Sequence, residues 1–314
     1  MARTLQNTRY QAFGFQIASE IPMPELLPPS GNEKRPVPDI EIELSNLTGM
    51  WLQNNARYGK FNLISDGILF QIPDIATFFI QDGKKIVVSP ADGSDMDEIR
   101  LYILGTCMGG ILLQRRVLPL HGSAIAIDGK AYAVVGESGA GKSTTSTALL
   151  NEGYQLLTDD VIAVTIQPGG QTPIVTPSYP QQKLWQESLE QFGRDSSGYR
   201  PLGQRETKFS VPVKSSFCAG PLPLAGIFEL VKSGKPEIEL KKISRLESLP
   251  LLYRHTFRNM LVRRLGLTGW HLDTTAMLAN QLNVFRLERP DSSFTAAELA
   301  SLIVTTVMRE KVYS

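Results

Sequence analysis

The chain has 314 residues, of which 42% are hydrophobic and 20% charged, the composition of an ordinary globular protein. Lys and Arg number 32 against 31 Asp and Glu, so the net charge gives no reason to expect nucleic acid or an anionic membrane as a partner. The longest apolar run, LYILGTCMGGILL, is too short to span a bilayer, and the N-terminus lacks the apolar core of a secretory signal. We therefore expect a cytoplasmic protein.

The two cysteines, Cys107 and Cys218, both lie in apolar surroundings. Two such residues make neither a disulfide framework nor a metal cluster, which fits a reducing compartment.

Residues 1–94 contain short runs rich in β-branched and aromatic residues, separated by Pro, Gly, Asn and Asp, which punctuate hairpins. The runs are AFGFQIAS, DIEIEL, GKFNLIS, GILFQI, ATFFIQ and KKIVVS. They predict a small β-rich N-terminal domain over residues 1–94.

Near residue 95 the hydrophobic period changes. The segment DMDEIRLYILGTCMGGILLQRR (95–116) starts with acids and ends with bases, and its apolar residues recur at helical spacing. This pattern predicts a helix, and we place the domain boundary at its start.

From residue 117 strands and helices alternate, which predicts an α/β or mixed-sheet domain over residues 95–314. A hairpin SAIAIDGKAYAVVG is followed by a helix and by a strand YQLLTDDVIAV. Later strands are expected at 223–231 and 283–290, with a closing helix at 295–310. Residues 190–222 show little periodicity and predict a long irregular loop.

The stretch GESGAGKS (136–143) fits the phosphate-binding loop G-x-x-x-x-G-K-[ST]. An apolar strand (131–135) precedes it and a helix (143–153) follows, as the motif requires. Backbone N–H groups would surround the phosphates of ATP, Lys142 would reach the β and γ oxygens, and Ser143 would bind Mg²⁺. The expected nucleotide-binding residues are Gly136, Glu137, Ser138, Gly139, Ala140, Gly141, Lys142, Ser143 and Thr144.

Phosphoryl transfer also needs a carboxylate that holds the metal or orients the acceptor hydroxyl. Asp159 and Asp160 follow an apolar run and are the candidates. On a regular strand they would point to opposite faces, whereas a turn would let both converge. His121 precedes the hairpin and is either structural or catalytic.

The role of one basic pair remains open from the residues alone. Lys208, with Arg205, either approaches a phosphate or belongs to a solvated basic loop. Trp185 is expected to pack in the core.

The segment LPLHGSAIAIDGKAYAVVGESGAGKSTTSTALLNEGYQLLTDDVIAV (118–164) resembles the catalytic core of HPr kinase/phosphorylase, in which a His-Gly pair, a hairpin, the phosphate loop and paired aspartates follow in this order. The likeness continues more weakly through residues 178–193. It implies that Asp159 is the general base, that Asp160 lies near the metal with Ser143, and that His121 belongs to the active site. It also implies an HPr-kinase-like fold and weakly favours a homo-oligomer.

Two departures from that family matter. The signature E-x-R-G-L-G, associated with dephosphorylation, does not occur in the chain, so phosphorolysis is not expected. The stretch YQAFGFQIASEIPMPELLP is similar to the start of HPr-kinase-like proteins of ribosomal peptide maturation, and above all to the lasso-peptide precursor kinases, which act on a C-terminal serine. The resemblance implies an ATP- and Mg²⁺-dependent peptide serine kinase, whose N-terminal sheet we expect to help recruit the peptide.

Three alternatives stay open. The protein could phosphorylate a small hydroxyl metabolite such as free serine, it could be a nucleotide-dependent regulatory protein, or it could be an HPr kinase proper. The acid pair disfavours the regulator, and the departures above disfavour the HPr kinase.

Overall fold

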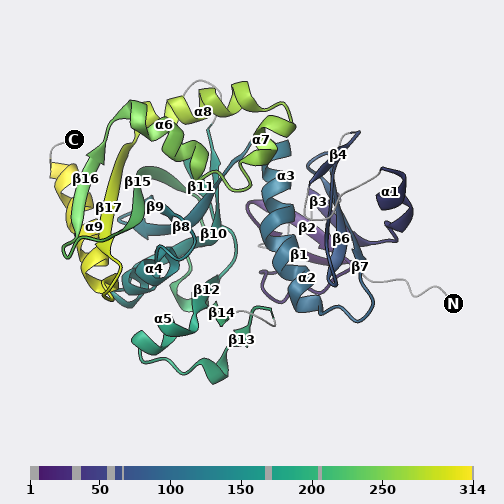
Figure 1. The fold of residues 1–314 in the computed structure, drawn as a ribbon, viewed down its shortest axis with the longest axis horizontal. Helices are drawn as coiled ribbons and strands as arrows, with labels where there is room; N and C mark the ends of the chain where they lie inside the picture. Colours follow the sequence, from purple (N-terminus) through teal and green to yellow (C-terminus); the bar gives the residue numbers. More distant parts are fainter. Residues whose placement is uncertain are drawn as a thin grey trace. The chain divides into compact units, whose positions relative to one another are not determined.

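The computed structural model describes residues 7–29, 37–54, 61–65, 67–166, 172–203 and 207–312. The chain forms two compact units (Figure 1). The first comprises Met1–Val117 together with Met260–Thr268, and the second comprises Leu118–Asn259 together with Gly269–Ser314.

The first unit is built on a mixed sheet with the strand order β1-β2-β3-β7-β6-β5-β4. Its strands are β1 (Thr8–Ala12), β2 (Phe15–Ser19), β3 (Ile40–Leu44), β4 (Asn62–Ile64), β5 (Gly67–Ile72), β6 (Ala76–Gln81) and β7 (Lys85–Pro90). Helix α1 (Thr48–Gln53) contributes Trp51 to a cluster with Leu69 and Phe79 of the sheet. The β-rich character expected of the N-terminal part is confirmed.

The helix expected over 95–116 is present in three pieces, α2 (Met96–Tyr102), a π-helical turn (Ile103–Cys107) and α3 (Met108–Gln114). It starts at Asp95, whose carboxylate accepts a hydrogen bond from the Asp97 amide. Helix α3 packs so closely on the sheet that a Cβ at Gly110 would lie 2.7 Å from the Ile80 side chain.

This helix therefore belongs to the first unit, which differs from the boundary expected near residue 95. The change of period marks the start of a helix whose apolar face covers the sheet before it, and the compact unit continues to Val117. Helix α7 (Met260–Arg264) also belongs to this unit and contacts α3.

The second unit contains a seven-stranded mixed sheet in the order β11-β10-β8-β9-β15-β17-β16. Its strands are β8 (Leu118–Ile127), β9 (Lys130–Gly136), β10 (Gln155–Thr165), β11 (Ile174–Thr176), β15 (Leu222–Ser233), β16 (Glu239–Ile243) and β17 (Asn283–Pro290). Strands β9, β15 and β17 run parallel, while β8 and β10 are antiparallel to their neighbours. The expected α/β class is confirmed.

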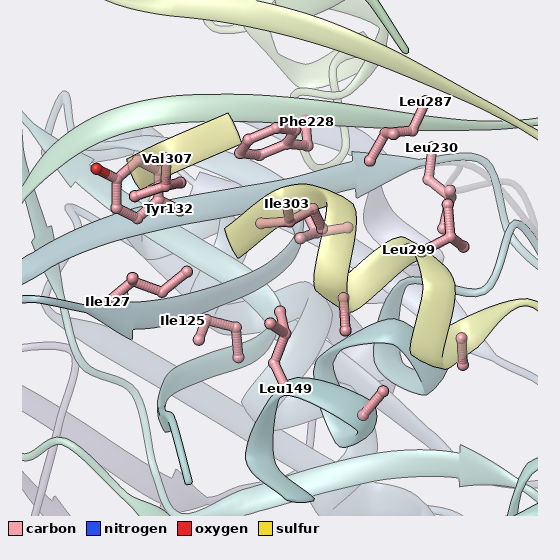
Figure 2. Close-up of a cluster of buried hydrophobic side chains, with 14 of the residues drawn as sticks. Ile125, Ile127, Tyr132, Leu149, Phe228, Leu230, Leu287, Leu299, Ile303 and Val307 are labelled. Carbon is pink, nitrogen blue, oxygen red and sulfur yellow. The ribbon is translucent and has the colours of Figure 1, made fainter. Parts of the chain in front are cut away.

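Alternate residues of these strands enter two hydrophobic clusters. Figure 2 shows the first, in which Ile125 of β8 and Phe228 of β15 pack with Leu149 of α4 (Lys142–Asn151) and Ile303 of α9 (Ala296–Val312). In the second, the next residues along the strands pack with α6 (Arg245–Arg254) and α8 (Thr268–Gln281). Helices thus pack on both faces of the sheet, because the side chains on both faces are apolar.

A third sheet, in the order β12-β14-β13, belongs to the second unit. It consists of β12 (Gln181–Trp185), β13 (Arg200–Pro201) and β14 (Lys208–Pro212), with α5 (Gln186–Gln191) after β12. In its described residues, the loop expected over 190–222 contains two strands and two short 3₁₀ turns (Ser196–Gly198 and Lys214–Ser216). These elements are only two to five residues long, so they leave little periodicity in the sequence.

In the described ranges, none of the helices combines the length and the apolar character that crossing a membrane requires. Cys107 is buried and Cys218 is half-buried, and the two are not joined by a disulfide.

Candidate active site

The phosphate loop joins β9 to the start of α4, as its motif predicts. Gly136 closes β9 with φ 155°, and a Cβ there would lie 2.5 Å from the Leu230 carbonyl oxygen. Gly141, at the N-cap of α4, has φ 103°. Both positions require glycine, and the loop presents its backbone N–H groups at a helix N-terminus, the arrangement that binds phosphate.

Lys142 lies back on its own loop. Its Nζ donates to the carbonyl oxygens of Gly136 at 2.9 Å and Glu137 at 3.0 Å, and the residue is 8% exposed. Burial lowers the pKa of the ammonium, and the charges of Asp159 and Asp160 oppose that shift. These two hydrogen bonds keep the Lys142 ammonium against the phosphate loop, where it could contact a bound phosphate.

Asp159 and Asp160 both line one cavity, although consecutive residues of a strand ordinarily point apart. The reason is the backbone of Asp160, which has φ 82° in the middle of β10. The pairing of β10 with β8 also shifts register just before them, between Leu156 and Thr158. The two acids therefore converge within a continuous strand, through the positive φ of Asp160, and not through the turn that the sequence left open.

The Asp159 carboxylate accepts hydrogen bonds from three donors. Ser123 Oγ lies 2.5 Å from Oδ1, Ser143 Oγ lies 3.0 Å from Oδ1, and the Lys183 amide nitrogen lies 2.8 Å from Oδ2. Asp159 is 3% exposed. The hydroxyl that the loop motif assigns to the metal is thus in contact with Asp159.

Asp160 is paired with a cation instead. Lys183 Nζ lies 2.6 Å from Asp160 Oδ2, and His121 Nδ1 lies 3.4 Å from Oδ1. Burial acts to raise the pKa of the Asp160 carboxyl, but Lys183 and then His121 outweigh it and lower the pKa to about 2. This carboxylate is therefore ionised at neutral pH.

His121 belongs to the same cluster. Its Nδ1 lies 3.0 Å from the Asp160 carbonyl oxygen, so Nδ1 carries the proton and Nε2 is the free nitrogen of the neutral ring. Burial lowers the pKa of His121, with Asp160 acting in the opposite direction. His255 and His271 are buried elsewhere, against Glu229 and Thr256.

The cavity has a volume of about 460 Å³. Of the residues predicted from the sequence, it is lined by His121, Ser138, Gly139, Gly141, Lys142, Ser143, Thr144, Asp159, Asp160 and Lys208. Gly136 and Glu137 instead supply carbonyl groups to Lys142, and the Ala140 carbonyl accepts from Arg289 Nε at 2.8 Å. Arg205 lies outside the described residues.

Trp185 was expected in the core, and the structure corrects this. It is 36% exposed and lines the cavity, because β12 places its alternate residues Lys183 and Trp185 on the face that lines the cavity. Lys208, opposite Trp185 on β14, places its Nζ 5.1 Å from the centre of the indole ring.

Sequence reasoning missed Lys183, Ser123 and Arg289. Lys183 had a signal, since it alternates with Trp185 in the segment 178–193 that carries the weaker resemblance. Ser123 also had one, since it lies in the segment 118–164 that carries the stronger resemblance. Arg289 had none, because only the folding of a distant strand brings it to the loop.

Oxygen donors suited to Mg²⁺ are present in the site, namely the Ser143 hydroxyl beside the Asp159 carboxylate. In the described part of the chain, no three or more His, Cys, Asp or Glu residues gather into a cage that could hold a metal ion by itself. An ion here would share its coordination with phosphate oxygens and water, which is how Mg²⁺ is usually bound beside nucleotides.

No model of a known protein family matches the chain. It is similar to the HPr kinase/phosphorylase of two Clostridium botulinum strains, Eklund 17B and Alaska E43, with 37% identity over 60 residues in each case. That stretch is 18% of this chain and 20% of each relative, so the chain matches about a fifth of the relatives' length.

Among solved structures, the HPr(Ser) kinase/phosphatase of Coxiella burnetii aligns with 62% of this chain and 97% of its own, with 17% identity and a TM-score of 0.31. The sequence likeness to a kinase is therefore confined to 60 residues of this chain.

Proposed function

We propose that this protein is an ATP- and Mg²⁺-dependent kinase that transfers the γ-phosphoryl group to a serine hydroxyl of a peptide. The observation that carries the proposal is the convergence of Asp159 and Asp160 in the cavity beside the phosphate loop. A protein that only senses nucleotide needs a phosphate loop but no second acid beside the metal position. The short likeness to HPr kinase/phosphorylase supports the same reaction class.

The contacts divide the work between the two acids. Ser143 and Asp159 would hold Mg²⁺, because the hydroxyl and the carboxylate lie 3.0 Å apart. When bound, Mg²⁺ neutralises charge on the β and γ phosphate oxygens. Asp160, beside His121, would face the acceptor hydroxyl. The contacts thus favour exchanging the roles that the resemblance implies, in which Asp159 is the base.

In the reaction the serine oxygen forms a bond to the γ-phosphorus, and the bond from that phosphorus to the β,γ-bridging oxygen breaks. The electron pair leaves with ADP, and the proton of the hydroxyl passes to Asp160. A carboxylate with a pKa of about 2 is a weak base, so the proton moves late, once the forming O–P bond has acidified the hydroxyl. A loose transition state tolerates this, since it depends on positioning and charge neutralisation more than on a strong base.

Lys142 would leave the carbonyl groups of Gly136 and Glu137 for the transferred phosphoryl group. Those carbonyl groups are uncharged, whereas a γ-phosphate offers the ammonium a negatively charged acceptor and therefore a stronger hydrogen bond. The N-terminus of α4 adds positive potential at the same place.

For the acceptor we propose the C-terminal serine of a lasso-peptide precursor, with the first unit's sheet taking part in recruitment. Support comes from the N-terminal resemblance and from the sheet itself, whose edge strands can pair with an extended peptide.

The test is the intact mass of such a precursor after incubation with the protein, ATP and Mg²⁺. The control is the same peptide with its last serine changed to alanine. A gain of one phosphoryl group by the serine peptide alone is expected. An unchanged mass together with ADP formation on free serine would instead identify a small-metabolite kinase.

A further inference from the structure

The cations that line the cavity differ in their partners. Lys183 is paired with Asp160 at 2.6 Å, and Lys232 with Asp291 at 2.9 Å. Lys142 and Arg289 donate to carbonyl groups of the phosphate loop. Lys208 contacts the face of Trp185, and within the described ranges no carboxylate lies within ion-pair distance of its Nζ.

This lysine is held in place from two directions. The pairing of β12 with β14 sets Lys208 directly opposite Trp185, so the two side chains share one face of the sheet. The ammonium then rests on the indole ring, which attracts a cation without neutralising its charge. A cation positioned in this way can still bind an anion.

The position of Lys208 relates it to the acceptor side of the site. Its side chain lines the same cavity as Asp160, the acid that would face the acceptor hydroxyl. Lys183, two residues from Trp185 on β12, makes the direct contact with Asp160. The third sheet therefore supplies Lys183 to the acid and presents Lys208 beside it, at the place where an acceptor hydroxyl would lie.

We propose that Lys208, positioned by Trp185, binds a carboxylate of the acceptor, so that the kinase selects a hydroxyl group with a free carboxylate close to it. This inference rests on the proposed function and names the chemistry that the site recognises. A C-terminal serine has both groups on one residue, whereas an internal serine lacks the carboxylate. The phosphates of ATP are the other source of anionic oxygens in this cavity.

The experiment uses the full chain and two synthetic peptides that end in serine, one with a free C-terminal carboxylate and the other with a C-terminal amide. Binding of each peptide in the presence of ADP and Mg²⁺ is measured by calorimetry, and phosphoryl transfer from ATP by mass. The variants are Lys208→Ala, Lys208→Arg and Trp185→Leu. The control is Lys214→Ala, which removes an exposed lysine just beyond β14 that does not line the cavity.

We expect Lys208→Ala to weaken binding of the carboxylate peptide by about tenfold or more, the loss typical of one hydrogen bond between charged groups. The amide peptide should bind weakly to the unmodified protein and be unaffected by the variant. Lys208→Arg should restore part of the binding, Trp185→Leu should act in the same direction as Lys208→Ala, and Lys214→Ala should change nothing. The affinity for ATP should not change.

Two results would overturn the proposal. Equal binding of the two peptides by the unmodified protein would show that no carboxylate is recognised. A loss of ATP affinity in Lys208→Ala, equal with either peptide, would assign the lysine to the nucleotide phosphates.

The outcome also separates this proposal from the proposed function. Equal transfer to both peptides would leave a kinase without the carboxylate subsite. Preferential binding of the carboxylate peptide through Lys208, without transfer, would leave the subsite in a protein that is not a peptide kinase.

Discussion

At the scale of single residues, Asp160 links backbone geometry to chemistry. A non-glycine residue with φ 82° inside a strand is unfavourable, and here the ion pair with Lys183 and the contacts of His121 hold it in place. The same conformation turns the carboxylate into the cavity beside Asp159. The convergence of the two acids in the cavity therefore depends on the third sheet, because its strand β12 supplies Lys183.

The two acids should respond differently to removal of charge. We expect Asp159→Asn to raise the Mg²⁺ concentration required for activity, since it replaces the charged carboxylate beside Ser143 by a neutral amide. Asp160→Asn should bind nucleotide and Mg²⁺ normally but lose about 10²-fold or more in kcat, the contribution of a positioned general base. Nucleotide binding and Mg²⁺ titrations of initial rate distinguish the two.

Asn is nearly the volume of Asp, so both variants should fold, and circular dichroism verifies this. If Asp159→Asn abolishes transfer at any Mg²⁺ concentration while Asp160→Asn keeps the normal rate, the roles implied by the resemblance are correct and the exchange is not.

The ion pair between Asp160 and Lys183 makes the stability of the fold depend on pH. Because the pKa of Asp160 falls from 3.8 to about 2 on folding, the pair stabilises the folded state above about pH 4, and this contribution disappears as the pH drops toward 2. The shift corresponds to about 2 kcal/mol. Urea unfolding should show Asp160→Asn less stable than the unmodified protein by about that amount at pH 7, with the difference vanishing near pH 2.

The variant also leaves the Lys183 ammonium, 14% exposed, without its partner. Adding Lys183→Met should therefore recover stability at pH 7, because an unpaired buried charge costs more than an apolar replacement. A difference between the variants that persists unchanged down to pH 2 would show that the pair does not set this pH dependence.

At the scale of elements, the hairpin, phosphate loop and following helix are predictable because each step has a local cause. Asp128 and Gly129 take positive φ between β8 and β9, which is the turn that a two-residue hairpin needs. Gly153, with φ 95°, follows the end of α4. The continuous apolar runs in β9 and β10 predict strands that are buried on both faces of the sheet, as the structure shows.

The rest of the site follows from contacts between distant strands, which single-sequence patterns do not contain. Gly122 shows this, since its need for glycine comes from β9, where the Val134 carbonyl oxygen would lie 2.2 Å from a Cβ. Trp185, expected in the core, is instead partly exposed with its ring against Lys208. Its partner Lys208 is 23 positions away, on a strand of five residues whose pairing with β12 the sequence does not show.

At the scale of the whole molecule, the chain leaves the second unit at Met260, joins the first unit through Thr268, and returns. This excursion explains why no single boundary in the sequence separates the units. Within it, α7 buries Leu261 and Val262, which are 0% and 1% exposed, and contacts α3. Arg264 of the same helix donates to the Phe61 carbonyl group. The apolar side of α7 therefore needs the first unit.

Removal of residues 1–117 should thus have two separable effects. A chain of residues 118–314 exposes Leu261 and Val262, at a cost of roughly 1.5–3 kcal/mol for each side chain, and should aggregate or melt at a lower temperature. The same chain with residues 260–268 replaced by Gly and Ser at equal length should stay monodisperse and bind ATP, because every site residue lies in the second unit. Light scattering, thermal melts and calorimetry measure these outcomes.

That repaired chain also tests whether the first unit recruits peptide. If its sheet pairs with the precursor, KM for the peptide should rise by about tenfold or more, a loss of 1.4 kcal/mol, while kcat at saturating peptide stays near that of the full chain. The phosphoryl-transfer site is intact in both proteins, so a change confined to KM isolates recruitment from chemistry. An unchanged KM would remove the N-terminal sheet from substrate binding and leave the acceptor to the second unit alone.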